Sequence, residues 1–182
     1  MFDLDQFVAE CKAALSDEDP TIVIRELVQD AIADPQGLRT AFDGRITGSS
    51  IAARSVHRTD DLTVLDVSTP VGMRTPAHNH NMWAVIGVYD GEEHNAFFEI
   101  EKEGPVQRNE RLLKTGDVAV LTPQTVHAIS NPLSRKSYAV HVYGGDLVNR
   151  DGRSVWNPHS GAREDYNVDK LSAYVKEMMA AA

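Results

Sequence analysis

Three histidines at particular spacings constrain the fold of this chain more than any other feature of its sequence. His78 and His80 form a His-x-His pair, and His127 comes after a short apolar run at residues 118–121. On a β-strand, residues i and i+2 point to the same face, about 6.5 to 7 Å apart. Both imidazoles of the pair can therefore share one metal ion, while the third ligand must come from another strand. The pattern favours a β scaffold with an all-histidine metal site.

Composition excludes several classes of protein. The 182 residues suit one domain with a sizeable core. A net charge of −9 makes nucleic acid a poor partner, since phosphate binding needs a basic surface. No apolar run approaches a membrane span, and the acidic N-terminus does not resemble a signal peptide. The single cysteine, Cys11, excludes an internal disulfide. We therefore expect a cytoplasmic protein that binds neither membrane nor nucleic acid, in an oligomeric state that the sequence leaves open.

Hydrophobic periodicity predicts helices at both ends of the chain and strands between them. Apolar residues at helical spacing indicate a helix over residues 3–15, with Cys11 on its buried stripe. A second helix begins at Asp19-Pro20 and should end near Asp34, because Pro35 disfavours helix in the residue before it. Turn residues separate the predicted strands, which cover residues 62–67, 83–89, 96–101, 118–121 and 138–143, and a closing helix covers residues 169–179.

Many short strands with regular turns favour a barrel or a double-sheet jelly roll. We expect a single, mainly β domain over residues 1–182. Its parts would be a helical N-terminal extension (1–44), a β-barrel core (45–150), and a loop with a C-terminal helix (151–182). The stretch from 144 to 167 is typical of a loop.

Two segments resemble the motifs of the cupin superfamily. They are the His78-Asn79-His80 pair with the apolar strand after it, and the run of residues 116–131 that contains His127. Cupins usually carry a glutamate ligand a few residues beyond the histidine pair, where this chain has Ala84 and Val85. The missing carboxylate and the late strand Ala139-Val140-His141-Val142-Tyr143 narrow the resemblance to the thiol dioxygenases, the group of cysteine dioxygenase and 3-mercaptopropionate dioxygenase.

The resemblance covers roughly residues 45–150 and implies the cupin double-stranded β-helix, a jelly-roll barrel with N-terminal helices and a short C-terminal helix. It also implies Fe²⁺ bound by His78, His80 and His127, with a small thiol and O₂ as substrates. Three neutral imidazoles leave the ion its full 2+ charge, so the site can take an anionic thiolate directly, and metal binding deprotonates a thiol. Reaction with O₂ would give a sulfinic acid.

His141 and Tyr143 share one face of the late strand by the same spacing rule. The resemblance makes them catalytic: Tyr143 would direct its hydroxyl at the substrate, and His141 would hold the tyrosine. The alternative is that both are core residues and that the tyrosine fills space. The family often has serine where this chain has Ala139. Cys11 lies far from Tyr143 in the sequence, so the thioether crosslink of the animal enzymes should be absent.

A substrate carboxylate needs a cation, ideally a guanidinium. Arg54 precedes the first core strand at about the place of the family's carboxylate-binding arginine, and its rivals are Arg58, Arg74, Arg150 and Arg153. Trp83 could line the pocket or simply pack in the core. For the other histidines a surface position is the default, and His94 lies in a polar run typical of a hairpin tip; they are His57, His94 and His159.

Two other functions remain open at this point. A different metalloenzyme on the same barrel could use zinc or nickel for hydrolysis, isomerisation or lyase chemistry. A non-catalytic cupin could bind a small acid. Metal analysis and oxygen uptake with a panel of thiols would separate these three functions.

Overall fold

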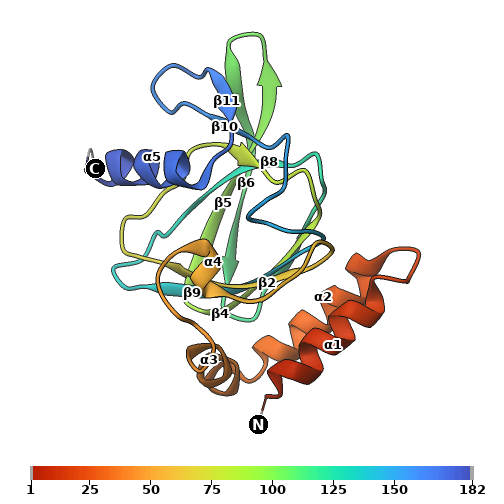
Figure 1. Ribbon diagram of the computed structural model, residues 1–182. Coiled ribbons are helices and arrows are strands. Elements are labelled where there is room, and N and C mark those ends of the chain that lie inside the picture. The colour runs from red at the N-terminus through yellow and green to blue at the C-terminus, as the bar shows by residue number, and fades with distance from the viewer. Residues whose placement is uncertain (1, 181–182) are drawn as a thin grey trace.

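The computed structural model describes residues 2–180, in which helices precede and follow a β-barrel along the chain (Figure 1). The helices are α1 (Leu4–Ala14), α2 (Pro20–Ile32), α3 (Pro35–Asp43), α4 (Ile51–Arg54) and α5 (Val168–Ala180). The strands are β1 (Ser55–Arg58), β2 (Thr63–Thr69), β3 (His78–Asn79), β4 (Ala84–Asp90), β5 (Glu92–Glu101), β6 (Gly104–Lys114), β7 (Val118–Leu121), β8 (Val126–Ser130), β9 (Ser137–Tyr143), β10 (Ser154–Trp156) and β11 (Arg163–Asp165).

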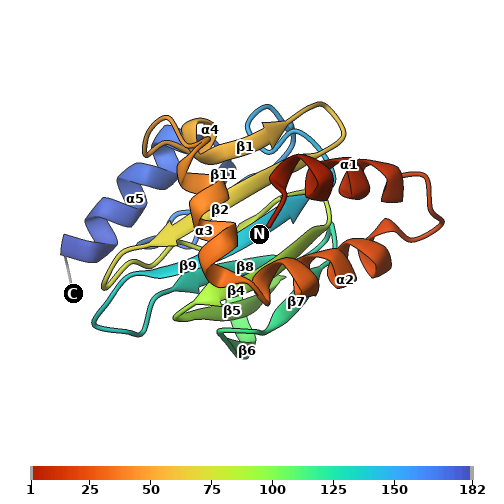
Figure 2. The ribbon, with the colours of Figure 1, turned by 90° about the horizontal axis from the view of Figure 1, so that it is seen from below.

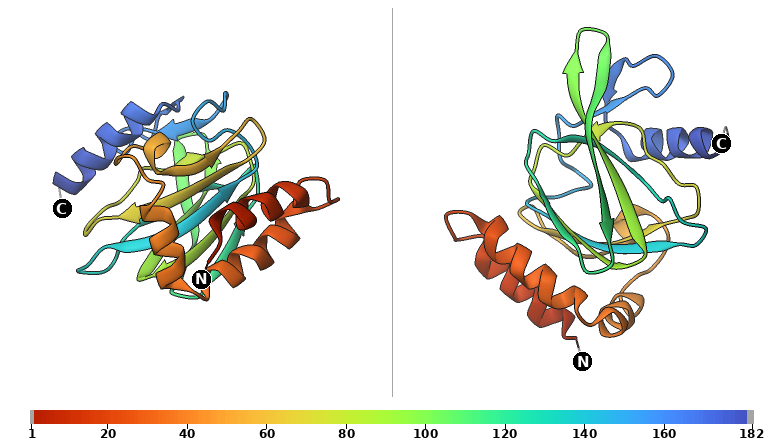
Figure 3. Two further views of the ribbon diagram at one scale, coloured as in Figure 1. Left: turned by 60° about the horizontal axis from the view of Figure 1, so that its bottom comes forward. Right: turned by 180° about the vertical axis from the view of Figure 1, so that it is seen from behind.

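The strands form two antiparallel sheets. One has the order β1-β2-β9-β4-β7 and the other β11-β10-β3-β8-β5-β6. From β2 to β9 the chain crosses to the opposite sheet at every connection except the β5–β6 hairpin, which projects beyond the barrel (Figure 3). The facing sets β2-β9-β4-β7 and β3-β8-β5-β6 have the connectivity of an eight-stranded jelly roll. The expected jelly-roll fold is confirmed.

Strand alternation divides the apolar residues into two clusters. On β9, Val140 and Val142 belong to a cluster beneath the N-terminal helices, whereas Ala139 and Tyr143 belong to a cluster inside the barrel. Helices α1–α3 lie across the outer face of the five-stranded sheet (Figure 2). Helix α2 lies so close to β4 that a side chain at Gly87 would collide with Val28. The helices therefore cover one sheet and leave the barrel interior for the site.

The N-terminal helices correct one prediction and confirm others. Helix α1 buries Cys11 completely, as its apolar stripe predicts. Helix α2 ends at Ile32, close to the predicted end. A further helix, α3, is not predicted from the sequence, because a proline at this place signals the end of one helix as readily as the start of the next. Pro35 occupies the first turn of that helix, where it needs no hydrogen-bond donor, and Asp34 caps the helix by accepting from the Gly37 amide.

Several strands were missed or misplaced. The predicted hairpin tip at residues 91–95 is wrong: His94 lies within β5, because the chain turns only at Gly91, where φ is +91°. Strand β6 is mostly exposed and polar, and therefore lacks an alternating apolar pattern. The expected loop at 144–167 contains β10 and β11, which extend the six-stranded sheet beside β3. Within residues 2–180, no helix is long and apolar enough to cross a membrane.

Candidate metal centre

The three predicted histidines converge inside the barrel. His78 on β3 lies opposite His127 on β8 in the strand register, and His80 follows directly after β3 ends at Asn79. One ring nitrogen from each lies within 4.8 Å of the others, and the three imidazoles are buried. The Nε2 atoms of His80 and His127 are 3.0 Å apart. In the described part of the chain this is the one cluster of potential ligands with metal-binding spacing, and it contains no carboxylate.

Hydrogen bonds orient two of the three rings. His78 Nδ1 lies 3.0 Å from the Pro76 carbonyl oxygen, and His127 Nδ1 lies 3.0 Å from Asn95 Oδ1. Both partners are acceptors, so both Nδ1 atoms carry the hydrogen. The lone pairs then lie on the Nε2 atoms and are available to a metal ion, as in most protein histidine–metal sites.

Burial keeps the three imidazoles neutral, which is the form that binds metal. It lowers the pKa of His78 to about 4, although the Pro76 carbonyl partly opposes the effect. Burial also lowers the pKa of His80 and of His127 well below the usual value, and the neighbouring histidines add to this. His80 Nδ1 has no hydrogen-bond partner despite its burial. Three neutral, converging imidazoles fit a divalent transition metal.

A cavity of about 200 Å³ lies beside the three histidines. Tyr143 and His141 both line it, as the spacing on β9 predicts. The Tyr143 ring packs against His80 at 5.0 Å between centroids, and its hydroxyl lies 2.9 Å from His141 Nδ1. Burial raises the pKa of Tyr143, and the Glu93 carboxylate adds to the effect. Tyr143 is therefore a neutral phenol at the cavity wall.

A buried carboxylate and its amide partner were missed. Glu93 is 1% exposed, and Oε1 accepts from Asn95 Nδ2 at 2.9 Å while Oε2 lies 3.3 Å from His141 Nε2. Burial acts to raise the pKa of Glu93, but His141 and Asn95 outweigh it and the pKa is lowered. Glu93 and Asn95 share one face of β5 at i and i+2, a period that a strand assignment for residues 92–95 would have revealed.

Arg54 lines the cavity but its charge is already paired. Its Nη2 forms an ion pair with Asp66, and its Nε donates to the Asp66 carbonyl at 2.8 Å. Asp66 also accepts from the Tyr89 hydroxyl at 2.6 Å and is fully buried. The guanidinium is therefore held by β2 and is not free at the cavity.

Arg153 is the rival with unsatisfied hydrogen-bonding capacity. It is 5% exposed, and it donates to the carbonyl oxygens of Arg150 and Val148, while Nη1 has no partner. The guanidinium stacks on the Tyr166 ring at 3.9 Å, and that ring lies 6.3 Å from the His78 ring and lines the cavity, whereas Arg153 itself lines a neighbouring hollow. Its charge is near enough to contribute to the lowered pKa of His78 and of His80.

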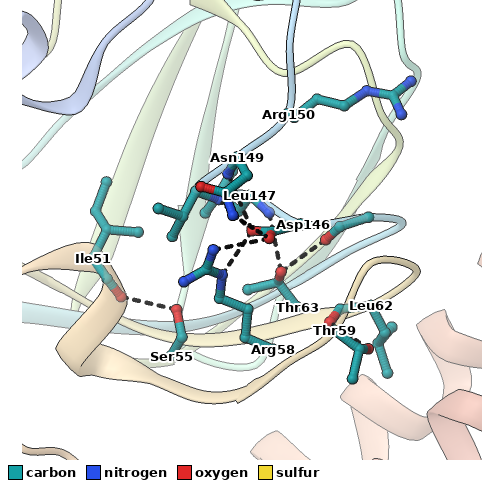
Figure 4. A network of polar contacts seen from close by, with 12 residues as sticks. Ile51, Ser55, Arg58, Thr59, Leu62, Thr63, Asp146, Leu147, Asn149 and Arg150 are labelled. Carbon is teal, nitrogen blue, oxygen red and sulfur yellow. Dashed lines mark hydrogen bonds and ion pairs between the residues drawn. The ribbon is translucent and has the colours of Figure 1, made fainter.

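The other rival arginines are occupied elsewhere. Arg58 forms a two-pronged ion pair with Asp146, whose carboxylate also caps the turn at residues 146–149 (Figure 4). Arg150 points away from this network and donates to the Asn81 carbonyl. Arg74 is exposed and borders a different hollow of about 600 Å³, to which the three histidines do not contribute.

Trp83 does not reach the cavity. Its side chain packs against the cluster beneath the N-terminal helices and lies so close to Gly144 that any side chain there would overlap the indole. The structure thus brings together the histidines, His141 and Tyr143, but it ties Arg54 to Asp66 and turns Trp83 toward the helices.

The topology and the histidine cluster together define a cupin fold with a centre able to hold a metal ion. No family model matches the chain. Among solved structures, it is similar to an uncharacterized conserved protein with a double-stranded β-helix domain from Klebsiella pneumoniae (21% identity, 63% of this chain and 87% of that chain, TM-score 0.49). It is also similar to an RmlC-like cupin family protein from Methanocaldococcus jannaschii (16% identity, 52% of this chain and 79% of that chain, TM-score 0.43). A third similar structure is oxalate oxidase in complex with glycolate (19% identity, 47% of this chain and 42% of that chain, TM-score 0.41).

Proposed function

We propose that this protein is an iron(II)-dependent thiol dioxygenase that oxidises a small thiol acid, such as cysteine or 3-mercaptopropionate, to its sulfinic acid with O₂. The observation that carries the proposal is the composition of the centre: three buried, neutral histidines without a carboxylate ligand, beside a cavity lined by Tyr143. Ferrous iron at such a centre would supply thiolate binding and the redox chemistry of O₂.

An acidic residue does lie near the centre, but it is not placed to act as a metal ligand. Glu93 is buried nearby, but both of its oxygens are engaged, one with Asn95 and the other with His141. Glu93 therefore has no free oxygen to offer a metal ion, and it contacts the ligand His127 only through Asn95. The centre keeps the positive charge of its ion, which favours an anionic sulfur ligand.

The size and polarity of the cavity support a small acid as substrate. A volume of about 200 Å³ suits a molecule with few heavy atoms, and its wall combines apolar side chains with the Tyr143 hydroxyl. Arg54 lines this cavity but is already paired with Asp66, whereas Arg153 lines the neighbouring hollow on the other side of Tyr166 and keeps a free Nη1, which makes it our candidate partner for a substrate carboxylate. Tyr166, stacked on Arg153, would then form part of the substrate wall.

A zinc or nickel cupin with hydrolase, isomerase or lyase activity is the alternative, since three imidazoles also suit those ions. A non-catalytic cupin that binds a small acid would use the same cavity without redox chemistry.

The test is oxygen uptake by the iron-reconstituted protein with a panel of thiols, together with metal analysis after anaerobic purification. We expect stoichiometric O₂ consumption and sulfinate formation with one or a few small thiol acids. The matched control is the same protein loaded with zinc. Binding of thiol acids without oxygen uptake by the iron-loaded protein would contradict the dioxygenase and favour the non-catalytic cupin.

A further inference from the structure

Glu93 stands at the centre of a hydrogen-bond chain with two arms, and this arrangement deepens the proposed function. One arm runs from Oε1 to Asn95 Nδ2 (2.9 Å) and from Asn95 Oδ1 to His127 Nδ1 (3.0 Å). The other runs from Oε2 to His141 Nε2 (3.3 Å) and from His141 Nδ1 to the Tyr143 hydroxyl (2.9 Å). A single carboxylate thus links a candidate metal ligand with the phenol at the cavity wall.

The direction of every hydrogen bond in the first arm follows from the charge of the carboxylate. An ionised carboxylate only accepts, so Asn95 must turn its NH₂ group to Glu93 and its oxygen to His127. That oxygen also only accepts, so His127 must carry its hydrogen on Nδ1. The lone pair of His127 is then on Nε2, which faces His80 Nε2 in the centre.

The second arm is ordered in the same way. His141 must carry a hydrogen on Nε2 to donate to Glu93, and the neutral ring then has its lone pair on Nδ1. The Tyr143 hydroxyl therefore donates to His141, and the free electron pairs of its oxygen remain for the cavity.

We propose that Glu93 is a positioning residue that fixes the tautomers of two histidines at once, His127 for metal binding and His141 for control of the Tyr143 hydroxyl. The charge of Glu93 is needed for both roles, because only a carboxylate can accept from the two arms together. The role of the first arm does not depend on the substrate, whereas that of the second rests on the proposed function.

The second arm also gives the substrate's proton a path. A thiol in the cavity can pass its proton to the Tyr143 oxygen while the tyrosine passes its own hydrogen to His141 Nδ1. The thiol becomes a thiolate, His141 becomes an imidazolium that faces the Glu93 carboxylate, and Tyr143 remains a neutral phenol. No proton is gained or lost, and Tyr143 now donates to the thiolate.

Glu93→Gln is the decisive variant because a glutamine has one acceptor and one donor. Its oxygen can accept from only one arm, and its NH₂ group must donate to the other. In that other arm every hydrogen bond then reverses its direction, which we call inversion. Inversion of the first arm flips Asn95 and moves the hydrogen of His127 to Nε2, with a loss of about 10- to 100-fold in zinc affinity. Inversion of the second moves the hydrogen of His141 to Nδ1 and leaves zinc affinity unchanged.

The measurement is ¹⁵N NMR of histidine-labelled, metal-free protein, in which no bound ion dictates the tautomer of His127, together with a separate zinc titration. We expect Nδ1–H at His127 and Nε2–H at His141 in the natural protein, inversion at one of them in Glu93→Gln, and the natural pattern in Glu93→Asp. The control is Glu110→Gln, which removes the carboxylate 3.2 Å from the half-buried His94.

The opposite tautomer at either histidine in the natural protein would overturn the proposal, even if Glu93→Gln did not fold. A folded Glu93→Gln with both tautomers and zinc affinity unchanged would overturn it as well. Failure of the protein to oxidise any thiol would instead contradict the proposed function. The histidine tautomers and the zinc affinity would still test the role of Glu93.

Discussion

The Tyr143 hydroxyl and His141 Nδ1 lie 2.9 Å apart on the same face of β9, both buried and both at the wall of the cavity beside the three histidines. In a dry pocket such a hydrogen bond holds the phenol more firmly than it would in water. It therefore sets where the one polar group of Tyr143 points.

Tyr143→Phe should remove the hydroxyl and keep the packing of the ring. We expect turnover of the iron-loaded protein to fall roughly 10- to 1000-fold, as is typical for one positioned hydrogen-bonding group, while iron content stays normal. Steady-state oxygen uptake with the best thiol measures the effect. His141→Gln should give a milder loss. Unchanged turnover in Tyr143→Phe would reduce this tyrosine to a packing residue.

Metal binding should require His78, His80 and His127 together. Replacing any one with alanine should remove most of the iron, because two imidazoles cannot complete the centre. Iron per protomer, measured after anaerobic reconstitution, is the readout, with circular dichroism to check the β fold. His94→Ala is a matched control, since His94 lies on β5 outside the cluster. Full occupancy in a variant would remove that histidine from the ligand set.

Acid should destabilise the metal-free protein through its buried histidines. An unfolded histidine binds a proton near pH 6.5, but folded His78 does so only near pH 4. Between these values the unfolded state holds more protons, so stability falls as the pH falls from about 6.5 to 4. At roughly 1.4 kcal/mol per pKa unit, His78 alone contributes about 3 kcal/mol.

Urea unfolding of the metal-free protein between pH 7 and pH 4.5 measures this loss. His78→Gln should weaken the dependence, because a glutamine does not titrate. An equally steep dependence in that variant would show that His78 is not its source.

Arg153→Gln should raise KM for a thiol acid more than it lowers kcat, because its free Nη1 would pair with the substrate carboxylate. A two-pronged or single guanidinium–carboxylate contact is worth about 1.5–3 kcal/mol, which corresponds to roughly 10- to 100-fold in KM. A thiol lacking the acid group should be unaffected. Arg54→Gln is the comparison, and we expect it to lower stability by leaving the buried Asp66 carboxylate without its counter-charge. A KM effect confined to Arg54→Gln would reverse this assignment.

Cys11→Ser should cost stability and leave turnover unchanged. Burial raises the pKa of the Cys11 thiol to about 12, with a smaller effect of Glu10, so the thiol is unreactive. A hydroxyl without a partner at this fully buried position should cost about 1–3 kcal/mol. Denaturant unfolding and oxygen uptake measure the two effects. A folded, iron-loaded but inactive variant would reveal a role for this cysteine in catalysis.

The sequence was sufficient for the features that depend on local spacing. The histidine pair, the strand with His141 and Tyr143, and the stripe with Cys11 each follow a period of two or of about 3.6 residues. The jelly roll followed from short strands with regular turns. These patterns exist because each of the elements has one buried face.

The sequence was insufficient wherever a side chain depends on a distant partner. Glu93 lies in a polar run typical of a turn, and its burial is possible only because His141, 48 residues later, lies across the barrel. The position of Arg54 in the sequence suggests a carboxylate partner in the cavity, but the fold pairs it with Asp66. Arg153 became the better candidate only through its burial and its free Nη1. Such pairings are set by tertiary structure and leave no periodic signal.

The direct pairing of His78 with His127 across β3 and β8 also means that a metal ion bound there would depend on the alignment of the two strands. A slip of one residue between these strands would turn one of the two imidazoles to the other face of the sheet. Strand β3 has only two residues in its ladder, so its own hydrogen bonds specify the alignment weakly. An ion that binds only when both rings face inward would select the correct alignment during folding, and the metal-free chain would sample misaligned strands more often than the loaded one.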